Sequence, residues 1–333
     1  MKFLILGLGS MGKRRVRCIH ALRAGEAIGV DARADRRAEA ERLYNIRTAG
    51  SFEEGMAADP DAVVICTPPD QHVSYGLATL AAGKPFFAEE TVTLDPAELT
   101  QLIDAIAASG LLAAPSCTMR FHPAILYVKQ ALDRGEVGEP LSFSAKLVSY
   151  LPGWHPWERV QDYYVNSRRS GGGREMIAFE MDWMEWLFGP VTSLAADVGK
   201  LSDIPADIDD TFQMLCRFAS GVRGAITVSV AYHVPVRAIE LCARDGQIEW
   251  DSRTHRVQVY TAHDARWQHL METASRDYSY DRMYIDEFDH FLQALAGRGV
   301  FTRDFRDVQR MLEVVAAAER SAVLGQRIGL AGQ

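Results

Sequence analysis

The sequence lacks the features that would place it in several classes of protein. Its 333 residues include five cysteines, and none forms a CxxC pair or lies near a histidine at the spacing of a zinc site. No apolar run is long enough to cross a bilayer, and the apolar start at residues 1–6 is not preceded by positive charge, as a signal peptide would be. We therefore expect reduced thiols and a cytoplasmic protein.

Positive charge and metal-binding motifs are also scarce. With 36 lysines and arginines against 44 aspartates and glutamates, the formal net charge is −8, so no basic surplus exists to displace the counterions of a nucleic acid. HExxH, Walker, nucleophile-elbow and EF-hand strings are absent, and no metal is expected. These absences leave small-molecule chemistry, without a nucleic-acid or membrane partner.

The hydrophobic pattern predicts an α/β protein of two domains. Residues 1–118 alternate short apolar runs with amphipathic stretches, which is typical of a parallel sheet covered on both faces. Residues 119–333 carry longer runs with period-2 alternation, which predicts a second α/β domain with a large, mostly antiparallel open sheet. No Pro/Gly/Ser-rich linker separates the two parts, so we expect them to enclose one cleft.

The expected elements can be given by residue range. In the first domain the strands are 2–6, 27–31, 62–67, 85–88 and 111–115, and the helices are 13–24, 34–44, 71–82 and 95–108. In the second domain the strands lie between 141 and 261, and the helices are 123–134, 174–187, 280–296 and 303–324.

A glycine-rich string identifies the first domain as a dinucleotide-binding, Rossmann domain. The string GLGSMG, residues 7–12, follows an expected strand, opens an expected helix and precedes Asp31 by 19 residues counted from Gly12. Gly7 permits the tight turn, Gly9 lets the backbone approach the pyrophosphate, and Gly12 lets helix and strand pack closely. The helix N-terminus then holds the phosphates.

Asp31 favours NAD over NADP. Its carboxylate is placed to accept hydrogen bonds from the adenosine ribose, and its charge repels a 2′-phosphate. Arg33, Arg36 and Arg37 follow at once and are able to clamp such a phosphate, so NADP stays the alternative.

Six further strings extend the pattern: CTPPDQH at 66–72, AGK at 82–84, MRFHP at 119–123, GGG at 171–173, WLFG at 186–189 and AERSA at 318–322. With them the chain resembles the glucose–fructose oxidoreductase/inositol dehydrogenase (Gfo/Idh/MocA) family over nearly its whole length. The strings SCTMRFHP and GWHPW are most similar to a branch linked to surface-glycan sugar synthesis.

The resemblance implies an NAD(P)-dependent oxidoreductase acting on a CH–OH group of a sugar or nucleotide sugar. It places Thr67, Pro68 and His72 along the cofactor, with Glu89 near the nicotinamide. It also implies a homodimer or homotetramer joined through the second-domain sheet, whose broad alternating face is expected to be covered. Taken together, the expected cofactor contacts are Gly7, Leu8, Gly9, Ser10, Met11, Gly12, Asp31, Ala32, Arg33, Thr67, Pro68, His72, Glu89 and Arg120.

The chain departs from the family at its proton-transfer groups. The family's lysine shuttle is replaced by Glu90, and its D-x-x-x-H pair becomes Glu175 and Phe179 if the helix has no gap. Glu90 is expected to act as the base, with its pKa raised by burial and by Glu89. The alternative is a salt-bridge partner at a strand end.

The remaining catalytic candidates are His122, Glu175 and Glu180. His122 lies at the entrance of the second domain, where a histidine is able to replace the lost group, or to make only a structural bond at a helix N-terminus. Glu180 is an acid in an apolar helical stripe, which suggests either a task or a pairing with an arginine of the sheet.

Substrate contacts are expected from two loops and one helix. Trp154 and His155 lie in an aromatic, proline-stiffened loop that suits a sugar, or alternatively a dimer contact. Arg168 and Arg169 precede a glycine run and a helix N-terminus, which suits an anionic substrate, or alternatively forms an exposed basic loop. Asp182 lies on the same helix as Glu175.

Three functions fit these residues. The leading one is an NAD-dependent dehydrogenase or reductase acting on a sugar-type hydroxyl. The second is a redox-neutral epimerase or lyase with tightly held NAD, which suits two acids and a histidine without the lysine. The third is a cofactor- or sugar-sensing regulator that has lost catalysis.

Overall fold

The protein is described by a computed structural model that covers residues 1–169, 171–254, 256–272 and 281–330. The chain divides into two compact units, Met1–Phe121 with Ser279–Gln309, and His122–Tyr278 with Arg310–Gln333. Each unit is described by itself. The first break lies close to the expected boundary at 118/119. The second break differs from expectation, because the segment Ser279–Gln309 groups with the first unit.

The first unit is built on a parallel sheet. In the described residues its six strands follow the order β3-β2-β1-β4-β5-β6, with every neighbouring pair parallel. The strands are β1 Lys2–Leu6, β2 Glu26–Val30, β3 Arg47–Ala49, β4 Ala62–Ile65, β5 Phe86–Ala88 and β6 Ala113–Pro115. The helices are α1 Ser10–Ala21, α2 Ala34–Tyr44, α3 Phe52–Met56, α4 Pro69–Ala81, α5 Pro96–Ser109 and α8 Asp281–Leu295, with a 3₁₀ turn at Thr118–Phe121. This order is that of a doubly wound Rossmann sheet.

Local sequence accounts for these boundaries. The strands are short apolar runs whose side chains are buried on both faces, as in β4, where all four residues are buried. Helix α5 is capped at its N-terminus by Asp95, whose carboxylate accepts a hydrogen bond from Ala97 N at 2.8 Å. Its C-cap is Gly110, in the left-handed region with φ of +63°. The expectation missed β3 and α3, because residues 47–56 carry little apolar periodicity.

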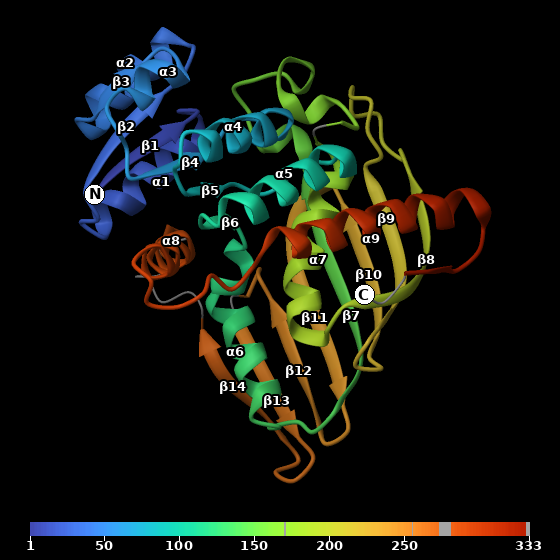
Figure 1. Ribbon diagram of the computed structural model, residues 1–333. Helices are drawn as coiled ribbons and strands as arrows, with labels where there is room; N and C mark the ends of the chain where they lie inside the picture. Colours follow the sequence, from blue (N-terminus) through green and yellow to red (C-terminus); the bar gives the residue numbers. More distant parts are fainter. Residues whose placement is uncertain (170, 255, 273–280, 331–333) are drawn as a thin grey trace. The chain divides into compact units, whose positions relative to one another are not determined.

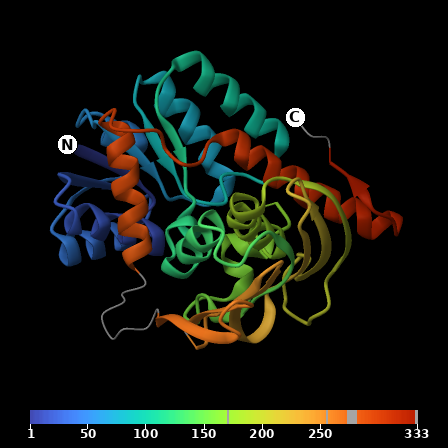
Figure 2. The same ribbon diagram turned by 90° about the horizontal axis from the view of Figure 1, so that it is seen from below.

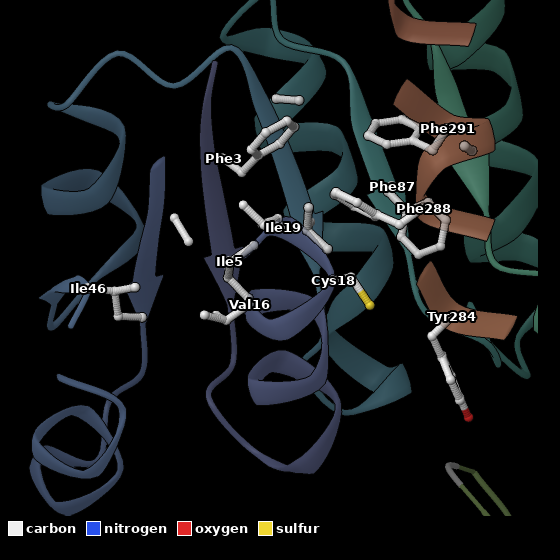
Figure 3. Packing of buried hydrophobic residues seen from close by; sticks show 14 of the residues in the cluster. Phe3, Ile5, Val16, Cys18, Ile19, Ile46, Phe87, Tyr284, Phe288 and Phe291 are labelled. Atoms are coloured by element: carbon white, nitrogen blue, oxygen red, sulfur yellow. The ribbon is translucent and has the colours of Figure 1, made fainter. Parts of the chain in front are cut away.

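Helix α8 completes the core of the first unit. Its buried residues fall at helical spacing: Met283, Tyr284, Glu287, Phe288 and Phe291. Figure 3 shows Phe288 and Phe291 beside Phe3 and Phe87 of the sheet, with centroid distances of 5.7 Å for Phe3–Phe288 and 5.5 Å for Phe87–Phe291. A segment far along the sequence therefore seals one face of the N-terminal sheet.

The second unit is built on a mostly antiparallel sheet. The described strands follow the order β14-β13-β12-β11-β7-β10-β9-β8-β15, and β7 and β10 are the neighbours that pair in parallel. The strands are β7 Pro140–Tyr150, β8 Val191–Gly199, β9 Thr211–Phe218, β10 Arg223–Ser229, β11 Ala231–Ala243, β12 Gly246–Asp251, β13 Arg256–Thr261, β14 Arg266–Glu272 and β15 Ile328–Gly329. Its helices are α6 Pro123–Asp133, α7 Gly173–Phe188 and the part of α9 (Phe305–Leu324) that follows Gln309. The sheet confirms the predicted fold class, although β14 and β15 were not expected.

The two faces of this sheet differ in chemistry. Alternate residues of β9 are buried, as in Phe212 and Met214, and α6 and α7 lie on that face (Figures 1 and 2). The opposite face presents mainly polar side chains, such as Gln213 and Arg217 of β9, with Leu215 as an exposed apolar residue. The dimer or tetramer through this sheet stays a prediction. None of the described helices is both long and apolar enough to span a membrane.

Candidate cofactor and active site

The loop after β1 is shaped by its glycines. Gly7 has φ of +87°, in the left-handed region that favours glycine. A Cβ on Gly12 would lie 1.8 Å from the carbonyl oxygen of Gly7, so α1 closes on the loop only with glycine there. A Cβ on Gly9 would have Nη1 of Arg36 as its nearest atom, at 3.9 Å, so the backbone is open on this side. The N-terminus of α1 has no side-chain cap, and Ser10 lies exposed in its first turn. This geometry suits a pyrophosphate.

Asp31 fixes this loop from the end of β2. Its Oδ2 accepts a hydrogen bond from Leu8 N and its Oδ1 accepts one from Arg33 N, both at 2.9 Å. Each carboxylate oxygen has a second lone pair, so the ribose hydroxyls still find acceptors. The side chain of Leu8 is buried in the core, and that of Met11 is half-buried. The cofactor contacts expected of these two residues would therefore come from their backbone atoms or from α1.

The three arginines after Asp31 differ in their partners. Arg33 pairs with Asp35 at 2.6 Å, and Arg37 donates to the carbonyl oxygens of Asp31 and Ala32 at 2.7 and 3.1 Å. Arg36 lies beside the Asp31 carboxylate, with Nη1 3.7 Å from Oδ2. Two of the three guanidinium groups are thus engaged away from a 2′-phosphate, which agrees with NAD.

The β4–α4 loop also fits a bound cofactor. His72 is buried, and its Nε2 donates to the carbonyl oxygen of Thr67 at 2.6 Å. Burial lowers the pKa of His72 to about 4, so the ring is neutral and holds the loop in place. Pro68 precedes the first turn of α4. In the described structure the buried hydroxyl of Thr67 has no hydrogen-bond partner, a need that a cofactor group is able to meet.

Four residues form a row just beyond the carboxyl ends of the neighbouring strands β1, β4, β5 and β6. Cys66 N donates to Leu6 O at 2.8 Å, Glu89 N to Ile65 O at 2.9 Å, and Ser116 N to Ala88 O at 2.8 Å. Gly7, Cys66, Glu89 and Ser116 therefore continue the register of β1, β4, β5 and β6. Ligands of open parallel sheets bind at this edge.

Behind the row lies a buried cluster centred on Arg15. Its Nε donates to Glu89 Oε1, and its Nη2 donates to Glu287 Oε2 at 2.6 Å. The guanidinium is fully buried, as is the Glu287 side chain, while 7% of the Glu89 side chain reaches solvent. Burial raises the pKa of Glu89, and the charge of Arg15 opposes that rise.

Glu90, the expected base, forms a buried ion pair with Arg303. Its two carboxylate oxygens face the two terminal nitrogens of that guanidinium, which also donates to the carbonyl oxygen of Ser116. The Glu90 side chain is 3% exposed and that of Arg303 is fully buried. Arg120 belongs to the same region, because its Nη1 donates to Thr302 O at 2.7 Å. The pairing favours the structural alternative for Glu90.

In the second unit, His122 and Glu180 also have structural partners. Nδ1 of His122 accepts a hydrogen bond from Ala124 N at 3.2 Å, and so caps α6. Glu180 accepts from Arg237 Nε of β11 at 2.7 Å and from Trp183 Nε1 at 2.8 Å. Both contacts match the structural alternatives.

Glu175 lies in a polar, aromatic cluster. The hydroxyl of Tyr164 donates to its Oε1 at 2.9 Å. The ring of His155 stacks between Tyr163 and Trp157, at centroid distances of 4.7 and 5.2 Å. The indole Nε1 of Trp154 donates instead to the hydroxyl of Ser149, at 3.1 Å. Asp182 is buried further along α7. The structure thus brings His155 and Glu175 into one cluster.

In the loop before α7, the two expected anion-binding arginines differ in their partners. Arg168 pairs with Asp207 at 3.3 Å and with Asp209, and Arg169 is exposed. The glycines that follow are packed rather than free, because a Cβ on Gly171 would lie 2.4 Å from Val165 Cα. A Cβ on Gly173 would lie 2.5 Å from Asp209 O.

Comparison with known proteins decides the family. The oxidoreductase-family model with an NAD-binding Rossmann fold matches residues 1–115, and the GFO/IDH/MocA C-terminal domain model matches residues 125–249. The chain belongs to the GFO/IDH/MocA oxidoreductase family. This confirms the resemblance, the fold class and NAD as the cofactor of the first unit.

Relatives of this GFO/IDH/MocA protein cover the full chain. Inositol 2-dehydrogenase of Rhizobium meliloti is 26% identical, over 99% of both chains. Levoglucosan dehydrogenase in complex with NADH has a TM-score of 0.88 at 19% identity, covering 99% of this chain and 98% of its own. The WlbA dehydrogenase of Bordetella pertussis, in complex with NADH and UDP-GlcNAcA, has a TM-score of 0.81 at 21% identity, covering 100% and 98%. At these identities the structures support the fold.

Three charged residues that contact Glu89, Glu90 or their partners were not predicted from the sequence: Arg15, Glu287 and Arg303. A signal was present for two of them, because Arg15 and Glu287 fall on the apolar stripes of their helices. Among the residues that the structure describes, no group of three or more histidine, cysteine or acidic side chains is placed to hold a metal ion.

Asp31→Ala should weaken NAD binding by about 10–100-fold, because hydrogen bonds to a charged group contribute roughly 1.5–3 kcal/mol. The affinity for NADP relative to NAD should rise, since the repelling carboxylate is gone. Asp35→Ala, which removes an exposed acid from the same segment, is the matched control and should leave the NAD affinity nearly unchanged. Calorimetric titration measures both, and equal NAD affinities of the two variants would contradict the assignment.

Gly173→Ala should lower the free energy of unfolding by about 1–3 kcal/mol, because the added methyl group meets a carbonyl oxygen and the ring of Phe212. Gly153→Ala is the control, since the nearest atom to its Cβ is Tyr150 Cδ1 at 3.8 Å, and a change within about 0.5 kcal/mol is expected. Urea unfolding compares them. Equal midpoints would mean that the glycine run is not a packing device.

Proposed function

We propose that the protein is an NAD-dependent dehydrogenase that oxidises a secondary hydroxyl of a sugar or cyclic polyol. The observation that carries the proposal is the loop over residues 7–12, closed by Gly12 on the Gly7 carbonyl and anchored by the Asp31 carboxylate. This loop is open beside Gly9, where a pyrophosphate would lie. When bound, NAD supplies a hydride acceptor at its nicotinamide ring.

The substrate class is inferred from the relatives and from one loop. The names inositol 2-dehydrogenase and levoglucosan dehydrogenase point to hydroxylated rings. Trp157 stacks on His155 and is 76% exposed, so it offers a flat aromatic face that suits the C–H face of a sugar. Glu175 and Tyr164 add acceptors and donors for hydroxyl groups.

An uncharged substrate fits better than a nucleotide sugar. Arg168, one of the two candidates for an anion contact, is neutralised by Asp207 and Asp209. A role in surface-glycan synthesis is a more specific version of this proposal. It requires that the protein oxidise the nucleotide sugar UDP-GlcNAcA in the test below. We place the reaction in the cytoplasm, because none of the five cysteines, all of them described, forms a disulfide.

The test follows NADH formation by absorbance with myo-inositol, levoglucosan and UDP-GlcNAcA as separate substrates. We expect turnover on the order of 1–10³ per second with a neutral ring substrate, and loss of most of it at low NAD concentration in Asp31→Ala. Product without net NADH, detected by chromatography, would instead indicate a redox-neutral epimerase or lyase. NAD binding without any reaction across a wider polyol panel would contradict the dehydrogenase and favour a regulator.

A further inference from the structure

In the first unit, the buried carboxylates of Glu89 and Glu287 share the guanidinium of Arg15. They differ in the number of hydrogen bonds that they accept. Glu287 accepts four hydrogen bonds: from Ser116 Oγ at 2.9 Å, Cys117 N at 2.5 Å, Thr118 Oγ1 at 3.0 Å and Arg15 Nη2 at 2.6 Å. Glu89 accepts a hydrogen bond from Arg15 Nε through Oε1, with the Cys66 thiol at 4.0 Å from the same oxygen. In the described structure, Oε2 of Glu89 accepts none.

This difference makes Glu89 the better placed of the two to accept a proton. A buried carboxylate with few hydrogen-bond donors is protonated more easily than one that has several. The cluster of Arg15, Glu89 and Glu287 carries a net charge of −1 when both acids are ionised, which is costly at a buried position. Adding one proton to Glu89 removes that charge without disturbing the bonds of Glu287.

Glu89 also lies where the chemistry is expected. It occupies the row just beyond the carboxyl ends of the strands, between Cys66 and Ser116 and in line with Gly7 of the dinucleotide loop. Part of its side chain reaches solvent, so the oxygen that Arg15 leaves open is reachable. The next residue, Glu90, has both oxygens on Arg303 and is the poorer acceptor.

We propose that Glu89 is the catalytic proton acceptor of the dehydrogenase, and that its protonation follows the oxidation state of the bound nicotinamide. This rests on the proposed function. The substrate C–H bond breaks and its hydride passes to NAD⁺, giving NADH. The hydroxyl O–H bond breaks and its proton passes to the Glu89 carboxylate, so the alcohol becomes a carbonyl group and charge balances.

The charged groups around Glu89 explain why its protonation would depend on the oxidation state of the nicotinamide. The groups that face it come from α1, the end of β4 and α8: Arg14, Arg15, Cys18, Cys66 and Glu287. Burial raises the pKa of Cys18 to about 11 and the pKa of Cys66 well above its usual value, so both thiols remain neutral. Because the thiols add no charge, the nicotinamide is the group whose charge changes beside Glu89. The positive ring of NAD⁺ favours the ionised carboxylate, and the neutral ring of NADH favours the protonated one.

The test measures binding without a substrate. Kd values for NAD⁺ and NADH are determined by calorimetry from pH 5 to 9 for the native protein, Glu89→Gln and Glu90→Gln. In the native protein NAD⁺ should bind more tightly relative to NADH as the pH rises, by up to about tenfold per unit between the two pKa values of Glu89. Glu89→Gln should remove this slope, and Glu90→Gln should keep it.

A second measurement needs no variant and so does not depend on folding. Calorimetry in buffers of different ionisation enthalpy should show that NADH binding takes up more protons than NAD⁺ binding, by as much as about one. Equal proton uptake, or a slope that persists in folded Glu89→Gln, would overturn the role of Glu89. A native protein that binds neither form would overturn the proposed function itself. Tight binding of both without pH linkage would overturn this inference alone.

Discussion

The buried guanidinium of Arg15 joins three segments of the first unit that are far apart in sequence. Its Nε and Nη2 donate to Glu89 and Glu287, and its Nη1 donates to the carbonyl oxygen of Tyr284 at 3.2 Å. The helix that carries Arg15 begins at the dinucleotide loop, and Glu89 follows the strand that ends beside it. An unpaired charge at this depth is strongly unfavourable, so each partner fixes the position of the others.

The same cluster connects fold and chemistry. Glu287 accepts hydrogen bonds from residues 116–118, which come shortly before the second unit begins at His122. Within the described residues, Oε2 of Glu89 accepts no hydrogen bond at the carboxyl edge of the sheet, whereas Glu90 is paired with Arg303. In the proposal made above, this arginine–carboxylate arrangement supplies the proton acceptor of the reaction.

Patterns local in sequence were predicted well, and pairings across the chain were not. The string GLGSMG and Asp31 predicted the cofactor loop, because both the turn and the acid are set by short-range spacing. Period-2 alternation predicted most of the large sheet. The grouping of α8 with the first unit, the pairing of Arg15 with Glu287 and the pairing of Glu90 with Arg303 depend on contacts between residues more than 200 positions apart. Spacing alone contains no information on such contacts.

The most direct test compares Arg15→Met with Arg17→Met in urea unfolding. Both arginines lie on α1, but Arg17 is half-exposed and pairs with Asp281, so removing it should cost at most about 1 kcal/mol. Removing Arg15 should lower the free energy of unfolding of the native protein by about 3–5 kcal/mol, because it leaves two buried acids without their shared cation. Equal losses for the two variants would contradict the claim that this guanidinium holds the first unit together.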